Sequence, residues 1–120
     1  AAGVSDRAHF LALAARAMRQ LMLNHARDRV ALKRGAGVVA LDVDEHADSI
    51  AAEARDLIEL DTVLARLEIE DASLARVVEC RLFAGMTDSE TADALGLPLR
   101  SAQRLWSQAR QRLAQLLDAA

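Results

Sequence analysis

The sequence predicts an all-α protein, and three features of its composition support this. Apolar residues make up 52% of the 120 positions, and most are Leu and Ala, which favour helices. Phe10, Phe83 and Trp106 are the three aromatic residues, Ile and Thr are scarce, and Tyr is absent. The single Pro and the Gly residues fall between segments of helical periodicity. We therefore expect a helical bundle, forming one domain or two very small ones.

Residues 7–31 are predicted to form one long amphipathic helix. Its apolar stripe recurs at helical spacing and consists of Phe10, Leu13, Ala14, Ala17 and Leu21, with Met18 and Met22 beside them. Ser5 or Asp6 can cap its start, and Gly35 follows basic residues at its end. This helix would make up a first unit, residues 1–35.

Residues 36–48 are predicted to form an acidic linker in an extended conformation. Its carboxylates, which are Asp42, Asp44, Glu45 and Asp48, lack the loop Gly and terminal Glu of a calcium site. The linker separates regions of different charge: residues 1–35 carry +5, residues 36–72 carry −9 and residues 100–120 carry +3. Basic ends are common in nucleic-acid-binding proteins, but ordinary solvated helix faces produce the same pattern.

Two helices are predicted next, over residues 49–68 and about 72–84. In the first, leucines repeat at spacings of three and four, at Leu57, Leu60, Leu64 and Leu67. In the second, Asp71 is the expected N-cap and Gly85 the expected stop. The side chains expected to point inward are Leu74, Val77, Val78 and Leu82.

Residues 87–113 have the pattern of a helix-turn-helix unit. Thr87 and Glu90 fit a capping box, Gly96 permits a tight turn, and the next helix opens at Pro98 or Leu99. The inward residues would be Ala92, Leu95, Leu97, Ala102, Leu105, Trp106, Ala109, Leu113 and Leu116. In such units the second helix lies in the major groove of DNA. Residues 49–120 would form this C-terminal domain.

The free face of the second helix carries side chains suited to DNA contact. These are Arg100, Ser101, Gln103, Arg104, Ser107, Gln108 and Arg110. Arg can bond guanine in a bidentate manner and Gln can bond adenine, whereas Arg110 and Arg112 are expected to meet phosphates. The alternative is a solvated helix that packs other helices. We favour DNA binding because the capping box, the glycine turn, the apolar stripe and the basic face all agree with a helix-turn-helix unit.

No catalytic, metal or cofactor site is expected. His9, His25 and His46 do not share a helical face near a Cys, and no nucleophile and base occur in a recognisable arrangement. Cys80 is the one cysteine and is expected to be a small core residue. Because no signal peptide or membrane-spanning run is evident, we expect a cytoplasmic protein without a membrane partner.

The chain resembles the later part of bacterial sigma factors of the extracytoplasmic-function (ECF) type. The end of that family's promoter-melting domain is similar to His9–Gln20, Asn24–Arg27 and Lys33–Gly35. The family's C-terminal domain is similar to Arg76–Thr87, Glu90–Ala92, Leu95, Gly96, Trp106, Ala109, Arg110 and Leu113. The resemblance covers most of the chain except the acidic linker.

This resemblance implies sequence-specific promoter binding as a sigma subunit of RNA polymerase. The C-terminal domain would read the −35 element and touch the β flap, and the N-terminal helix would belong to the domain that binds β′ and handles the −10 element. Residues near DNA would then include Arg19, Asn24, Arg27, Lys33 and Arg34. An anti-sigma factor would be a further partner.

The sequence also departs from the family. Gln103 stands where Lys is usual, Leu105 where an acidic residue is usual, and Asn24 where Asp is expected, so promoter preference is not transferred. The family's preceding helices have no counterpart in this chain. We therefore expect a truncated form, a proteolysed form or a degenerate relative, which should not start transcription alone.

Two other functions fit the same residues. One is a stand-alone helix-turn-helix regulator that binds a palindromic operator as a dimer. The other is an interaction module that binds no DNA, such as a sigma-like decoy. In each case the apolar stripe of the first helix should be buried against another surface. We therefore expect this helix to dock on the C-terminal domain or to pair with another copy.

Overall fold

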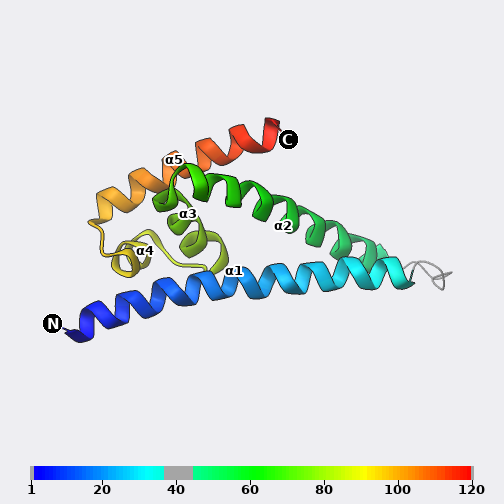
Figure 1. Cartoon of the computed structure of the whole chain (residues 1–120), viewed down its shortest axis with the longest axis horizontal. Coiled ribbons are helices and arrows are strands. Elements are labelled where there is room, and N and C mark those ends of the chain that lie inside the picture. The colour runs from blue at the N-terminus through cyan, green and yellow to red at the C-terminus, as the bar shows by residue number, and fades with distance from the viewer. Residues whose placement is uncertain (1, 37–44, 120) are drawn as a thin grey trace.

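The computed structural model describes residues 2–36 and 45–119, and its regular elements are all helical (Figure 1). They are, in chain order, α1 (Ala2–Ala36), α2 (Glu45–Glu70), α3 (Ala72–Val78), η1 (Glu79–Phe83), α4 (Asp88–Leu95) and α5 (Leu99–Ala119). The predicted all-α class is confirmed. Among the described helices, none has both the length and the apolarity that crossing a membrane requires.

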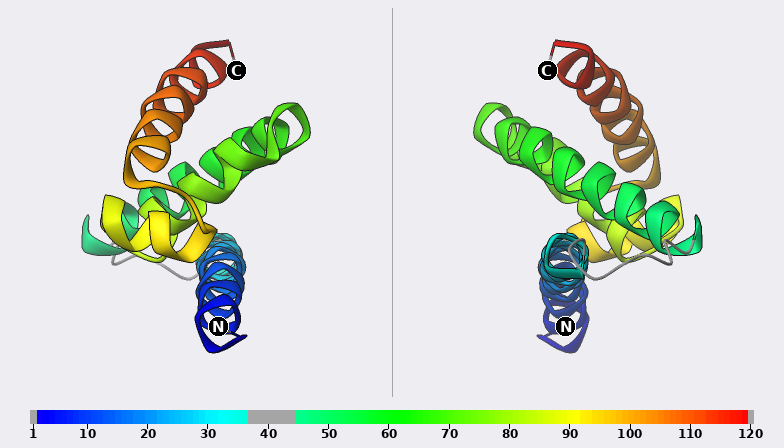
Figure 2. Two further views of the ribbon diagram at one scale, coloured as in Figure 1. Left: turned by 90° about the vertical axis from the view of Figure 1, so that its left-hand side faces the viewer. Right: turned by 90° about the vertical axis from the view of Figure 1, so that its right-hand side faces the viewer.

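The long helix α1 forms one side of the molecule. It packs against α2, η1 and α4, whereas α5 packs on α2, α3 and α4. Figure 1 shows α2 running back alongside α1, with α3 and α4 between α1 and α5. The end-on views of Figure 2 place α1 at one edge and α5 at the opposite edge. The face of α5 that points away from the bundle is therefore not covered by α1.

The main core joins α2, α3, η1 and α5. Its buried residues are Val63, Leu64, Leu67, Leu74, Ala75, Val78, Phe83, Ala109, Leu113 and Leu116. The leucine repeat of α2 and the apolar stripe of α5 thus contribute to the same core. A second, smaller cluster brings together Ala15 of α1, Cys80 of η1 and Ala94 of α4. Through this cluster α1 is attached to the helix that begins the helix-turn-helix unit.

The boundaries of the first two helices differ from the prediction. Because α1 begins at Ala2, Ser5 and Asp6 lie inside the helix and do not cap it. Because α2 begins at Glu45, the last residues of the predicted 36–48 linker are helical. Acidic residues are favourable in the first turn of a helix, which explains this earlier start. The predicted extended conformation of residues 37–44 lies outside the described residues.

The apolar stripe predicted on the first helix does not face the bundle. Phe10 and Leu21 are 68% and 63% exposed, and Leu13 is also exposed. The face that packs carries Ala15, Leu23 and Ala26 instead. One of the two expected arrangements, docking on the C-terminal helices, is therefore present, but through a different face of the helix. This inner face also carries Arg19, whose ion pairs with α2 and η1 are described below.

The predicted helix over residues 72–84 changes its geometry midway. Asp71 caps α3 as predicted, since its carboxylate accepts a hydrogen bond from the backbone N–H of Ser73 at 3.0 Å. Residues 79–83 form a π-helix, in which the Ala84 N–H reaches the Glu79 carbonyl oxygen, five residues back, at 3.1 Å. The wider turn buries Glu79, so Leu82 was wrongly predicted to point inward and is 45% exposed.

Candidate nucleic-acid interface

The capping box predicted at the start of α4 is present. The Thr87 hydroxyl oxygen accepts from the Glu90 backbone N–H at 3.1 Å, and the Glu90 carboxylate accepts from the Thr87 backbone N–H at 2.9 Å. The hydrogen bond that the Thr87 backbone donates to the Glu90 carboxylate favours its ionised form and is the main reason that the pKa of Glu90 is lowered; the Thr87 side chain lowers it further. These bonds satisfy backbone donors at the N-terminus of α4 that would otherwise lack partners.

A tight turn connects α4 to α5. Gly96 has φ of 66° in the left-handed region, and the Leu97 N–H bonds the Ala92 carbonyl oxygen at 2.9 Å. Ala92 is buried and Leu97 is half-buried beneath the turn. Since α5 then begins at Leu99, the order of short helix, glycine turn and longer helix agrees with a helix-turn-helix unit.

Replacing Gly96 with alanine should destabilise this turn. An added Cβ would meet no atom within 4 Å, so only the left-handed backbone opposes the change. We expect the free energy of unfolding to fall by about 1–2 kcal/mol, measured by urea denaturation. Gly96→Asn is the matched control and should lose less, because Asn tolerates this conformation. Equal stability of Gly96→Ala and the unchanged chain would contradict a strained turn.

The outer face of α5 is open to solvent. Six of the predicted contact residues are exposed and Ser101 is half-buried; the six are Arg100, Gln103, Arg104, Ser107, Gln108 and Arg110. The inner face is buried at Ala102, Ala109, Leu113 and Leu116, with Leu105 and Trp106 half-buried. The predicted division into an apolar and a polar face is therefore observed. The remaining predicted residues, Lys33 and Arg34, fall in the last turn of α1, where only the backbone is described.

Two arginines contact the ring of Trp106. The guanidinium carbons of Arg81 and Arg110 are each 5.3 Å from the centroid of its ring. Arg81 also donates a hydrogen bond to the Met86 carbonyl oxygen, just before α4. Cation–π contacts of this kind stabilise by about 0.5–1 kcal/mol at exposed sites. Arg81 was not among the predicted site residues, although it links η1, the loop before α4 and α5.

Arg112 forms an ion pair with a carboxylate of α2. It was expected to meet phosphates together with Arg110, but its Nε and Nη2 atoms bond both oxygens of the Glu70 carboxylate, at 2.8 and 2.7 Å. The Arg112 hydrogen bond lowers the pKa of Glu70. This pair joins the end of α2 to α5, so the Arg112 charge is already partly neutralised.

Arg19 is also paired within the protein. Its Nε atom lies 2.7 Å from an oxygen of Asp61, and its Nη1 atom lies 2.9 Å from an oxygen of Glu79. Arg76 bonds the second oxygen of Glu79 and also Glu68. The resemblance had placed Arg19 near DNA, but its side chain is only 12% exposed. Asn24 and Arg27, which the resemblance placed there too, are exposed.

Sequence reasoning did not single out Glu79 or Asp61. A signal for Glu79 was present, because it follows Val77 and Val78 and lies four residues, about one helical turn, after buried Ala75. A charged residue in such a position needs a partner of opposite charge. The position of Asp61 shows no comparable signal.

Cys80 and His25 have structural explanations. Burial, followed by the charge of Glu79, raises the pKa of the Cys80 thiol to about 11, which fits the predicted core role. His25 accepts a hydrogen bond from Arg29 Nε at 2.9 Å. Among the described residues, no group of three His, Cys, Asp or Glu side chains is placed to hold a metal ion.

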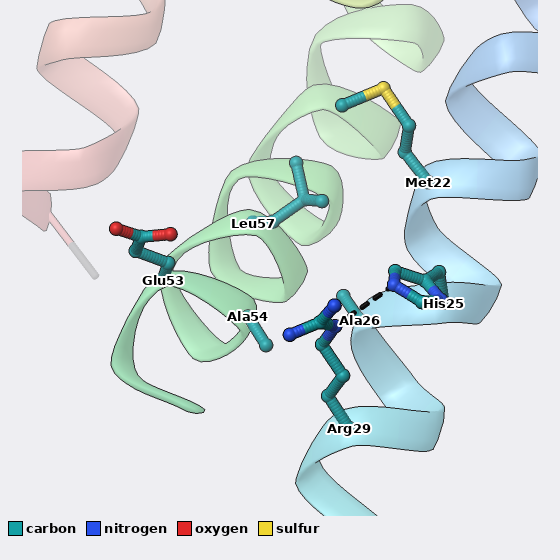
Figure 3. A pocket seen from close by; sticks show the side chains of 7 residues that line it. All are labelled: Met22, His25, Ala26, Arg29, Glu53, Ala54 and Leu57. Carbon is teal, nitrogen blue, oxygen red and sulfur yellow. Dashed lines mark hydrogen bonds between the residues drawn. The ribbon is translucent and has the colours of Figure 1, made fainter. Parts of the chain in front are cut away.

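A pocket of about 380 Å³ opens between α1 and α2 (Figure 3). It is lined by Met22, His25, Ala26, Arg29, Glu53, Ala54 and Leu57. Figure 3 shows Arg29 bonded to His25 at its edge, with Glu53 turned away on the other helix. Since its polar groups do not converge on one point, the pocket does not resemble a small-molecule site.

Comparison with known proteins identifies one family. The family model described as "ECF sigma factor" matches residues 1–119, which include both α1 and the α4–α5 unit. No curated protein and no solved structure matches the chain.

Proposed function

Because the chain belongs to the ECF sigma factor family, which acts in transcription initiation, we propose that it binds promoter DNA through α5 and directs RNA polymerase to the start site. One observation carries this proposal. The exposed face of α5 is free of acidic residues from Leu99 to Leu117 and lies opposite a buried apolar face, directly after the capped α4 and the Gly96 turn.

Each predicted contact residue of α5 has a proposed role. Arg100, Gln103 and Arg104 lie near the N-terminal end of the helix, which in helix-turn-helix units contacts base edges. Arg110 lies further along the helix and would meet a phosphate, held in place by Trp106. The other proposed contacts to DNA are Ser101, Ser107 and Gln108 on α5, and Lys33 and Arg34 on α1.

The proposed partners follow from the family. The C-terminal domain, residues 49–120, would bind the −35 element and the β flap of core RNA polymerase. The helix within residues 1–35 would belong to the part that meets β′ and the −10 element. An anti-sigma factor is a further proposed partner, and the site of action would be the cytoplasm. The family consists of transcription factors rather than enzymes.

Replacing Arg104 with alanine should weaken specific DNA binding. If the guanidinium bonds a base, we expect a loss of about 1–3 kcal/mol, or roughly 5- to 150-fold in Kd. DNA selected from a random pool by this chain would serve as ligand, with fluorescence anisotropy measured at several salt concentrations. Arg66→Ala is the matched control, because Arg66 is exposed on α2.

The outcomes of this experiment separate the proposed roles. Loss of affinity in Arg104→Ala, but not in Arg66→Ala, supports α5 as the recognition helix. Unchanged affinity in both Arg100→Ala and Arg104→Ala would eliminate that assignment. An affinity that does not fall with salt would argue against DNA binding altogether, because phosphate contacts release counterions.

A second candidate is a stand-alone dimeric regulator. The exposed stripe of α1 favours it, since Phe10, Leu13 and Leu21 form an apolar surface of the kind that pairs with another copy. A dimer would select DNA with two-fold symmetry and half-sites about 34 Å apart. A pull-down with core RNA polymerase distinguishes the two, because only a sigma factor is expected to bind it.

A further inference from the structure

The helix α1 has two faces that could pack, and the chain itself uses one of them. The packed face carries Ala15, Leu23 and Ala26, which are almost fully buried. Since an α-helix turns by about 100° per residue, Phe10 and Leu21 project from the far side of the helix, where they are exposed. Figure 1 shows the other helices on one side of α1. Another molecule can therefore cover the far side without displacing α1 from the bundle.

Four residues on the far side have the spacing of a helix–helix contact, and we call them the outer seam. They are Phe10, Ala14, Ala17 and Leu21, which follow one another at intervals of four, three and four residues. This is the spacing of the a and d positions of a coiled coil. The small alanines at the centre let a second helix approach closely, and the large side chains at the two ends supply apolar area. The outer seam therefore fits one more helix.

A second copy of α1 fits the outer seam when the two helices run antiparallel. In that alignment Phe10 of each copy lies against Leu21 of the other, and Ala14 of each copy lies against Ala17 of the other. Large side chains thus meet at both ends and small ones at the centre. The pairing is unchanged when the two copies are exchanged, as the interface of a two-fold symmetric dimer requires.

Charge favours the antiparallel orientation over the parallel one. Asp6 and Arg27 are both exposed at the edge of the outer seam, and antiparallel pairing brings Asp6 of each copy beside Arg27 of the other. It also places Arg7 against the neutral Asn24. In a parallel pair, Arg7 would face Arg7 and Asp28 would face Asp28. Charges at such positions set the orientation of paired helices, because like charges repel across the contact.

We propose that α1 is a homodimerisation helix, and that two copies of the chain associate through the outer seam in an antiparallel, two-fold arrangement. This interface goes beyond the DNA contact proposed above and does not depend on it. Figure 2 places α5 at the edge of the molecule opposite α1, so the dimer leaves the outer face of α5 uncovered. Docking on the C-terminal helices and pairing with another copy use opposite faces of α1, so the two arrangements occur together.

Sedimentation equilibrium of the full chain, without DNA or polymerase, measures this association. The dimer has twice the 13.0 kDa mass of the monomer, and concentrations from about 1 μM to about 1 mM cover the expected affinity. Leu21→Glu places a charge against Phe10 of the other copy twice in each dimer, so the dissociation constant should rise roughly tenfold or more. Leu21 is 63% exposed, and circular dichroism should show an unchanged helix content.

Leu32→Glu is the matched control. Leu32 lies on the same helix and is similarly exposed, at 71%, but in the antiparallel alignment it extends beyond the end of the other copy. The same chemical change there should leave the dissociation constant within about twofold of the unchanged chain. A control that weakens the dimer as much as Leu21→Glu would show that the added charge acts without regard to position, and would overturn the proposed interface.

A charge exchange tests the orientation. Arg27→Glu puts two negative groups side by side at each end of the dimer, and should weaken association by about two- to tenfold. Adding Asp6→Lys restores the opposite charges, so the double variant should regain the affinity of the unchanged chain. No recovery in the double variant would rule out the antiparallel alignment.

The remaining outcomes concern what covers the outer seam. Dimers in the unchanged chain and in Leu32→Glu, but not in Leu21→Glu, support the proposal. A chain that stays monomeric at every concentration would overturn it. If that monomer binds core RNA polymerase and Leu21→Glu abolishes the binding, the outer seam is a polymerase contact instead. Since DNA is absent from the sedimentation experiment, failure of the dimer leaves the proposed function of α5 unaffected.

Discussion

Replacing Glu79 with glutamine is expected to lower the free energy of unfolding by about 2–3 kcal/mol. The carboxylate is 2% exposed and accepts hydrogen bonds from Arg19 and Arg76, on two different helices. The neutral amide keeps the shape but loses both charge interactions. The expected effect is below that of a fully buried pair, because Arg76 is partly exposed and keeps Glu68 as a partner. Urea denaturation followed by circular dichroism at neutral pH measures it.

Glu59→Gln is the matched control for this prediction. Glu59 is exposed on α2, so the same chemical change there should alter stability by no more than about 0.5 kcal/mol. If Glu79→Gln is as stable as Glu59→Gln, the ionic cluster makes no net contribution to folding, and its desolvation offsets its attraction.

Replacing Leu67 with alanine should destabilise the main core more than the Glu79 substitution destabilises the ionic cluster. Leu67 is fully buried at the centre of this core, among side chains from α2, α3, η1 and α5. The lost apolar contacts and the resulting cavity together should lower the free energy of unfolding by about 3–4 kcal/mol. Since domains of this size are stable by only about 5–15 kcal/mol, much of the total would be lost. Thermal and urea unfolding both measure the change.

Ile69 provides the comparison on the same helix. It lies two residues after Leu67 and is 87% exposed, so Ile69→Ala should alter stability by about 0.5 kcal/mol or less. Similar unfolding midpoints for the two variants would show that the main core does not form around α2 in solution.

The features that the sequence predicted correctly depend on neighbours within a few residues. Asp71 caps α3 two residues away, and Thr87 and Glu90 cap α4 through bonds that span three residues. Gly85 and Gly96 both have positive φ and end helical segments as predicted. Short-range hydrogen bonds and backbone preferences depend only on nearby residues, so they can be predicted without knowledge of the fold.

The incorrect predictions depend on contacts that are distant in the sequence. The inner face of α1 carries Arg19, whose partners Asp61 and Glu79 are 42 and 60 residues away. The apolar stripe that includes Phe10 and Leu21 was prominent in the sequence, yet this pattern does not say which face meets the bundle. The helical periodicity was correct, but its orientation was not.

For the candidate site on α5, too, the local pattern was predictable from the sequence and the long-range contacts were not. The alternation of apolar and polar residues along α5 was enough to identify its exposed face, including Arg100 and Arg104. The engagement of Arg112 by Glu70 and the stacking of Arg81 on Trp106 were not predictable, because both depend on how α2 and η1 lie against α5.

The π-helix at residues 79–83 also determines how the segments after it, α4 and α5, are oriented relative to α1. An α-helix turns by about 100° per residue, and the wide turn accommodates a residue that a regular α-helix would place elsewhere. Glu79 and Cys80 face α1, while Phe83, four residues on from Glu79, faces the main core. A one-residue deletion in η1 would therefore rotate the residues that follow it about the helix axis. The positions of α4 and α5 relative to α1 would change, although the sequences of α4 and α5 would not.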